Sequence, residues 1–266
     1  MLTRYYSIIR HLLFVLCFVL QTCLLTLAQT NAAQARKFDE FGDIQHSDLI
    51  ARLDNFAVEL QNQPGARGFL IVYRARRDLP GLSNRYALHM KDYLVHSRGI
   101  STERIATVDG GVSSCLTQEL WIVPVGATPL PRNDAYFDSY RGEAFKFDEH
   151  YYSLPSDPGG AIYWSEAPDN LFVYLDAFAA ALQKEPRSIG YLVAYKSRRD
   201  GAAVTQQMFR REKNFLIKEY GIKSSRIKMI DGGYRKWRWM ELWIVPPGED
   251  APILAPSQIL RNRRKR

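Results

Sequence analysis

The sequence has little cysteine, and this shortage limits its chemistry. Its three cysteines are Cys17, Cys23 and Cys115, and the first two lie in an N-terminal apolar stretch. If that stretch is removed, Cys115 remains alone, so neither an intrachain disulfide nor a cysteine-based zinc site can form. We therefore expect stability to come from packing, with no metal and no cofactor.

Histidine is also scarce, and no catalytic constellation is visible. Beyond the N-terminal stretch the histidines are His46, His89, His96 and His150, and none lies in a nucleophile or metal-binding pattern. Serine and carboxylate patterns give no better set of acid, base and nucleophile. We therefore predict that the protein is not an enzyme, and a hydrolase of envelope polymers ranks last among the alternatives.

The N-terminal segment has the features of a secretory signal. Arg4 and Arg10 precede an apolar run over residues 12–28, and Ala33-Gln34-Ala35 supplies the small residues that signal peptidase accepts. We predict that residues 1–35 are a cleaved signal peptide and that the protein is exported to the periplasm or cell envelope. An uncleaved membrane anchor is the alternative.

Most of the net charge lies at the C-terminus. The formal charge is +8, and the last six residues, 261–266, carry five of these charges. Residues 251–266 therefore form a basic tail that contacts polyanions or acidic lipid, or else only keeps the protein soluble. Membrane contact is expected only through this tail or the signal segment, and export argues against nucleic acid as a partner.

The chain contains an internal repeat at an offset of 122 residues. Residues 53–126 align with residues 175–248 without a gap, and 29 of the 74 aligned positions are identical. The shared stretches include Leu-Asp-x-Phe-Ala, Arg-Arg-Asp, Asp-Gly-Gly and Glu-Leu-Trp-Ile-Val-Pro. A unit of this length is too long for a solenoid repeat and can form its own core. The repeat therefore predicts two domains of one fold.

Each copy has the periodicity of a β-α-β-α-β-β unit. Apolar residues at helical spacing predict two helices, and Gly99 and Gly221 follow the second helix of each copy as C′ residues. Asp-Gly-Gly is interpreted as the tight turn between the last two strands. The predicted elements after a short first strand are residues 49–60, 68–73, 84–98, 104–108 and 119–124, and in the second copy residues 171–182, 190–195, 205–220, 226–230 and 241–246.

This pattern predicts an α/β (α+β) fold of two tandem two-layer sandwiches, each with its helices on one sheet face. The predicted division is a signal peptide at 1–35, a first domain at 36–126, a linker at 127–146, a second domain at 147–250 and the tail at 251–266. An irregular loop is expected near Pro155, Pro158 and Gly159.

The element order, with Gly-Ile-x-x-x-Arg-Ile after the second helix and a final strand ending Glu-Leu-Trp-Ile-Val, resembles the OmpA C-terminal-like family. That resemblance implies noncovalent binding of peptidoglycan in the bacterial envelope. In the family an Asp after the second strand and an Arg early in the second helix hold diaminopimelate of the stem peptide. Asp78 and Asp200 match this Asp, whereas Tyr86 and Met208 occupy the place of the Arg.

Charged residues near these aspartates form two candidate ligand sites. A receptor for diaminopimelate needs a guanidinium group that binds the carboxylate and, close to it, a hydrogen-bond acceptor for the ammonium group. Solvated strand ends, with the Asp capping a turn, are the alternative interpretation. The candidates are Arg77, Asp78 and Arg85 in the first copy, and Arg199, Asp200 and Arg211 in the second.

Alternation along the strands also predicts an aromatic face on each sheet, opposite the helices. Two such faces would not both stay exposed to water. We expect the two domains to pack sheet against sheet, or one face to dock a partner or glycan. The predicted open-face residues are Phe69, Tyr73, Trp121, Tyr191, Tyr195, Trp237, Trp239 and Trp243.

The sequence thus favours an exported, non-enzymatic envelope protein that attaches to peptidoglycan. The alternative is a protein interaction or scaffolding module that has kept the fold and lost this ligand.

Overall fold

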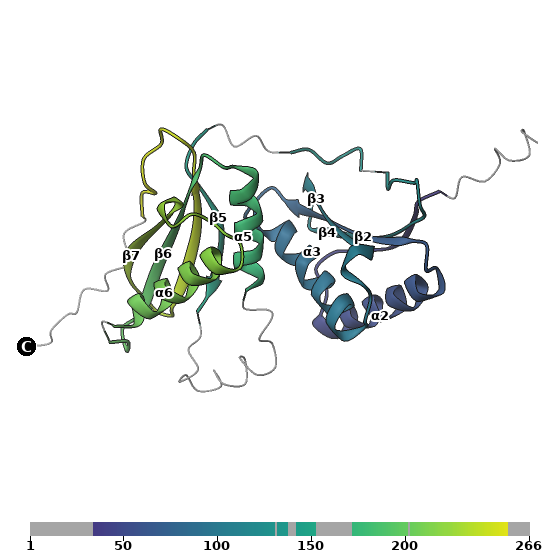
Figure 1. Ribbon diagram of the computed structural model, residues 1–266, viewed down its shortest axis with the longest axis horizontal. Helices are drawn as coiled ribbons and strands as arrows, with labels where there is room; N and C mark the ends of the chain where they lie inside the picture. Colours follow the sequence, from purple (N-terminus) through teal and green to yellow (C-terminus); the bar gives the residue numbers. More distant parts are fainter. Residues whose placement is uncertain (1–33, 131, 138–141, 153–171, 202, 255–266) are drawn as a thin grey trace, which may run out of the picture.

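The computed structural model confirms the predicted fold class (Figure 1). It describes residues 34–130, 132–137, 142–152, 172–201 and 203–254. The signal segment up to residue 33, the loop expected near Pro155 and the tail from residue 255 lie outside the described residues. None of the helices in the described residues is long and apolar enough to cross a membrane.

The first domain has one four-stranded sheet and two main helices. Its strands follow the order β1-β4-β2-β3, with β2 and β3 parallel and the other neighbours antiparallel. A five-residue π-helical turn, Tyr93–Ser97, prolongs the second helix. The elements are β1 Arg36–Phe41, α2 His46–Asn62, β2 Arg67–Ala75, α3 Leu82–Asp92, β3 Ile105–Ser113 and β4 Thr117–Val123.

The second domain repeats this topology. Its sheet has the order β5-β8-β6-β7, with β6 and β7 parallel. The first strand begins at Phe145, two residues before the predicted domain start at 147. The elements are β5 Phe145–Tyr151, α5 Val173–Lys184, β6 Ile189–Ser197, α6 Ala203–Lys218, β7 Ile227–Arg235 and β8 Trp239–Val245.

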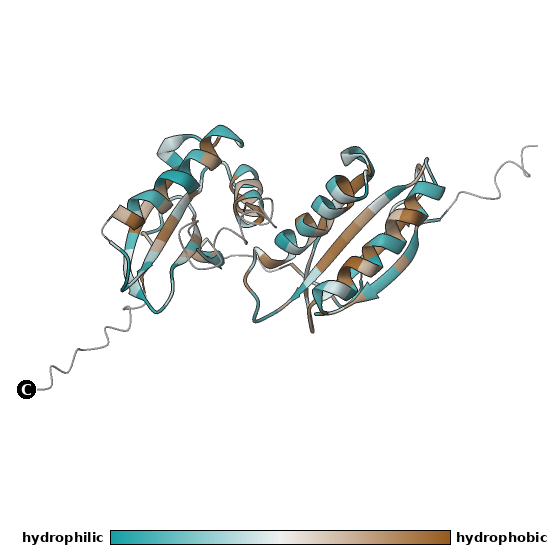
Figure 2. Ribbon diagram, turned by 90° about the horizontal axis from the view of Figure 1, so that it is seen from below, coloured by the Kyte–Doolittle hydropathy of each residue, from teal (hydrophilic) through white to brown (hydrophobic). Residues whose placement is uncertain are grey.

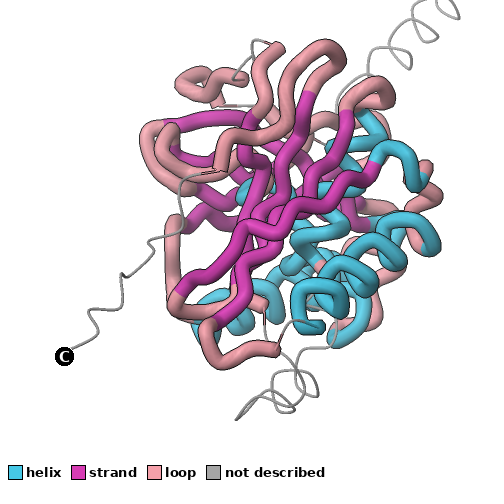
Figure 3. The backbone as a smooth tube through the Cα atoms, turned by 90° about the vertical axis from the view of Figure 1, so that its left-hand side faces the viewer, coloured by secondary structure: helices cyan, strands magenta, loops and turns pink. Residues whose placement is uncertain are grey.

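In each domain both helices cover the same face of the sheet (Figure 3). The hydrophobic core lies between the helices and the sheet. The helices are amphipathic and turn their apolar stripes toward the strands (Figure 2). Gly68 has no room for a side chain, because an added Cβ would lie 2.9 Å from Leu60 and 3.0 Å from the ring of Phe56. Gly99 and Gly221 have φ of 68° and 64°, which confirms the predicted C′ glycines.

The prediction that Asp-Gly-Gly forms the turn between the last strands is wrong. Asp109 and Asp231 lie inside β3 and β7, and each strand has a β-bulge at the following glycines. Gly111 has φ of 85°, a left-handed conformation that glycine adopts readily. Gly110 lies against the ring of Tyr73, 2.5 Å from where its Cβ would be. Gly111 therefore allows the backbone conformation of the bulge, and Gly110 allows the Tyr73 ring to pack closely against the strand.

Part of the predicted linker covers the open face of the first sheet. This segment, residues 127–130 and 132–137, is called the strap. Ala127 and Ala135 pack against the buried cluster that contains Tyr73 and Trp121. The strap also pairs with the edge strand β3, since Val112 and Tyr136 exchange backbone hydrogen bonds of 2.7 and 3.0 Å. The linker thus completes the first domain.

The prediction that the domains pack sheet against sheet is wrong. The contact between them is made by α3 of the first domain and α5 of the second, which lie side by side (Figure 1). The backbone N–H of Gly81 donates to the carbonyl of Phe147 at 2.7 Å. A Cβ on Gly81 would lie 2.7 Å from the Phe147 ring and 2.9 Å from Asp148. The close approach of the backbone at Gly81 to β5 therefore holds the two domains together at this point.

Candidate functional site

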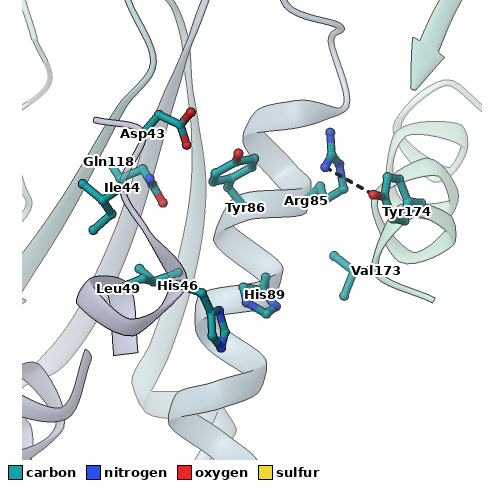
Figure 4. A pocket seen from close by; sticks show the side chains of 10 residues that line it. All are labelled: Asp43, Ile44, His46, Leu49, Arg85, Tyr86, His89, Gln118, Val173 and Tyr174. Atoms are coloured by element: carbon teal, nitrogen blue, oxygen red, sulfur yellow. Dashed lines mark hydrogen bonds between the residues drawn. The ribbon is translucent and has the colours of Figure 1, made fainter. Parts of the chain in front are cut away.

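A cavity of about 280 Å³ lies between the domains, on the surface of α3 (Figure 4). It extends from the connection between β1 and α2 across α3 to the start of α5. Apolar side chains form part of its wall, and polar groups of both charge signs face the same space. The lining residues are Asp43, Ile44, His46, Leu49, Arg85, Tyr86, His89, Gln118, Val173 and Tyr174.

Arg85 supplies the positive charge of the cavity. Its Nε donates to Oδ2 of Asp148 at 3.1 Å, and its Nη1 lies 3.5 Å from the hydroxyl oxygen of Tyr174. The guanidinium also stacks 4.5 Å from the Tyr174 ring centroid. A guanidinium has five N–H donors in a planar fork, so these contacts leave donors for a ligand carboxylate.

Asp43 supplies the accessible acceptor of the cavity, and the buried Gln118 lies beside it. Asp43 is exposed at the mouth of the cavity, near the phenol of Tyr86 (Figure 4). Burial, with the charge of Asp43 as a further cause, raises the pKa of Tyr86. Gln118 is 1% exposed, and its Nε2 donates to the carbonyl of Gly42 at 3.0 Å. Among the described residues nothing donates to its Oε1, although a buried amide oxygen is costly to leave unpaired.

The second domain supplies part of the cavity wall, and one position where the two copies differ accounts for the contact with Arg85. In the first domain Asp39 binds Arg52, with Nη1 at 2.6 and 2.8 Å from its carboxylate oxygens. Asp148 is the counterpart of Asp39, but Tyr174 stands where the repeat would place Arg52. Arg85 of the first domain takes over this role for Asp148. Burial raises the pKa of Asp148, and the nearby charge of Arg85 offsets only part of that effect.

Of the predicted site residues in the first copy, the structure places Arg85 in the cavity. Asp78 accepts the backbone N–H of Ala75 at 2.9 Å through Oδ2, which is the turn-capping arrangement. Arg77 is exposed on the same turn. The ligand-binding roles of Asp78 and Arg77 remain predictions.

In the second copy the predicted residues are separated. Asp200 accepts hydrogen bonds from both Nε and Nη2 of Arg238, and its side chain is 2% exposed. Arg199 is exposed beside it. Arg211 lies on α6, with Nη1 3.4 Å from the hydroxyl oxygen of Tyr152. Asp200 and Arg211 thus have different partners. The ligand-binding roles of Asp200, Arg199 and Arg211 remain predictions.

A buried polar cluster distinguishes the second core from the first. His150 and Glu212 are almost fully buried, with Nε2 and Oε1 3.9 Å apart. His150 Nδ1, Glu212 Oε2 and Thr205 Oγ1 have no hydrogen-bond partner among the described residues. In the first domain Phe41 and Met90 occupy the positions of His150 and Glu212.

The predicted aromatic residues lie on the sheet faces opposite the helices, except Trp237. In the first domain Tyr73 and Trp121 are buried under the strap, and Phe69 packs beside them. Tyr195 is buried beneath the guanidinium of Arg235, 3.5 Å from its ring centroid. Trp237 lies in the connection between β7 and β8 and is exposed.

The remaining predicted aromatic side chains, Tyr191, Trp239 and Trp243, are half-buried on the second sheet.

A buried glutamate organises each of these faces. Glu119 accepts Nζ of Lys37 at 2.7 Å and Nε1 of Trp121 at 2.8 Å. Arg132 of the strap lies 3.8 Å from the same carboxylate. The equivalent Glu241 accepts Nη2 of Arg235 at 2.6 Å.

Further donors to Glu241 are Nε1 of Trp243 at 3.1 Å and the hydroxyl of Tyr195 at 3.2 Å. Burial opposes ionisation of Glu241, but the hydrogen bonds from Arg235 and Trp243 outweigh it and lower its pKa. In the first domain the strap supplies the arginine, Arg132. In the second domain β7 supplies Arg235 instead.

The described residues contain no group of three or more His, Cys, Asp or Glu side chains that could hold a metal ion. No family model matches the chain, and no curated protein matches it.

Proposed function

We propose that the protein is a non-enzymatic component of the bacterial cell envelope, with the OmpA C-terminal-like architecture, that binds the stem peptide of peptidoglycan in the interdomain cavity. The proposal is supported mainly by one observation: the guanidinium of Arg85 and the carboxylate of Asp43 line the same cavity, whose wall is partly apolar. Arg85 fits a carboxylate, and the exposed carboxylate of Asp43 fits an ammonium group. A zwitterionic amino acid centre such as that of diaminopimelate has both groups.

The apolar wall supports the same ligand class. Ile44, Leu49 and Val173 line the cavity together with the charged groups. Diaminopimelate joins its two amino acid centres by a short aliphatic chain, which suits such a wall. The proposal places the acceptor at Asp43, and not at Asp78, whose carboxylate already caps the turn after β2.

Sedimentation with purified peptidoglycan tests this function. We expect the wild-type protein to sediment and Asp43→Asn to lower the bound fraction at least about tenfold, because a charged acceptor is removed without a change of shape. Asp48→Asn is the matched control, since Asp48 is an exposed carboxylate in the first turn of α2 outside the cavity.

Three further variants separate the cavity from the predicted strand-end site. Arg85→Gln should weaken sedimentation, whereas Arg77→Gln should not. If Asp78→Asn and Arg77→Gln abolish sedimentation and Asp43→Asn does not, the ligand binds at the strand end and the cavity proposal is wrong. A wild-type protein that stays in the supernatant would favour the interaction module instead.

A further inference from the structure

Three aromatic residues lie at one end of the second sheet, where β5 and β7 end and β8 begins. Tyr151 pairs with Trp239 across β5 and β8, and their rings meet edge to face at 6.4 Å between centroids. Trp237 lies two residues before Trp239. Tyr151 is 45% exposed and Trp237 is 53% exposed, so both present ring surface to solvent.

The first domain shows that the fold does not need these rings. Gly42, Cys115 and Thr117 stand at the positions of Tyr151, Trp237 and Trp239 in the first copy. All three are small, and the same topology forms around them. Exposed aromatic side chains that contribute little to a core and lie together are typical of a binding surface.

Cationic groups border the rings. Lys236 lies over the Trp237 ring, with Nζ 5.2 Å from its centroid. Arg238, the next residue, accepts the backbone N–H of Tyr152 at 3.0 Å and binds Asp200 through its guanidinium.

These two contacts of Arg238 join the end of β5 and the turn after β6 to the connection that carries Trp237. The exposed Arg199 precedes Asp200 in that turn and therefore lies at the same end of the sheet. Ser114 and Leu116 replace Lys236 and Arg238 in the first copy, so these two charges are particular to the second domain, whereas Arg199 has the counterpart Arg77.

We infer that this aromatic and basic surface binds a carbohydrate chain that carries carboxylates. Sugar rings present C–H groups that pack on the faces of Trp and Tyr, and Lys236 with Arg199 can pair with the acidic groups. The site is separate from the interdomain cavity. Only the choice of stem-free peptidoglycan glycan, whose lactyl carboxylates are free, as the natural ligand rests on the proposed function.

The test uses peptidoglycan glycan strands from which an amidase has removed the stem peptides, leaving lactyl carboxylates on the sugars. We expect the full protein to bind these strands in affinity electrophoresis. Trp237→Ala combined with Trp239→Thr should weaken binding at least about tenfold. Thr is the residue of the first domain at the second position, so the fold accepts it.

Control variants show whether a loss of glycan binding is caused by this surface. Tyr234→Ala removes a ring that is 48% exposed near the end of β7, where its pairing with Lys196 places it on the sheet face opposite Tyr195 and Trp239, and should leave binding unchanged. Asp43→Asn and Arg85→Gln should lower sedimentation with intact peptidoglycan but not retention by stem-free glycan, which separates failure of one proposal from failure of the other.

Four results would overturn the inference: no binding of wild type to stem-free glycan, undiminished binding by the double variant, equal binding to neutral dextran, or tighter binding to single-stranded DNA than to glycan.

Discussion

Replacing Glu119 by leucine is expected to destabilise the first domain by about 2–4 kcal/mol, because it removes the acceptor of several donors at once. The carboxylate is fully buried and binds Lys37 and Trp121. Without it, Nε1 of Trp121 stays buried and unpaired, and Lys37 keeps only the more exposed Glu40 as an acidic partner.

Hydrogen exchange of the backbone amides of β4 and β8 measures this effect for each domain separately. Protection should fall along β4 and remain unchanged along β8. Glu40→Gln is the control, since Glu40 is partly exposed and its ion pairs are expected to contribute less than about 1 kcal/mol. Unchanged protection of β4 in Glu119→Leu would show that the carboxylate does not hold the sheet face together.

A gain in stability, and not a loss, is expected when the buried polar cluster of the second domain is replaced. His150→Phe combined with Glu212→Met installs the residues that the first domain has at these positions. It removes a buried pair whose polar atoms are incompletely bonded. Replacement of such pairs by apolar residues of similar size is often neutral or stabilising by about 1–4 kcal/mol. We expect a gain within that range.

Denaturant unfolding, with exchange of the β8 amides to identify the domain, measures the gain. The reciprocal double variant, Phe41→His with Met90→Glu, should destabilise the first domain, since it places the same polar groups in an apolar core. A loss of stability in His150→Phe with Glu212→Met would show that the cluster is satisfied in the protein by a bound group.

The fold was predictable from the sequence because the repeat and the periodicity agree. Leu53, Phe56 and Leu60 recur at helical spacing, and all three are buried against the sheet. Gly99 ends the helical segment with the left-handed conformation that its position predicts. The Asp-Gly-Gly error has a physical cause, since paired glycines suit a β-bulge as well as a tight turn.

The domain contact and the cavity could not be predicted from residues that the copies share. They are built from positions where the copies differ, such as Arg52 and its counterpart Tyr174. No pattern in the sequence points to Gln118 either, because its role depends on the fold that buries it.

Sheet-against-sheet packing was the wrong interpretation because the first open face has a cover in its own chain. Ala127 and Ala135 of the strap pack against the buried cluster that contains Tyr73 and Trp121. The segment after β4 has no strong strand pattern, so its pairing with Val112 is visible only in the structure.

Calorimetric titration with a tripeptide containing diaminopimelate tests the central claim most directly, because it removes the polymer and leaves only the ligand proposed for the cavity. We expect one site per chain in the wild-type protein and loss of measurable binding in Asp43→Asn combined with Arg85→Gln. Absence of binding to the wild-type protein, or equal affinity in the double variant, would contradict the proposal that the cavity between the two domains holds the stem peptide.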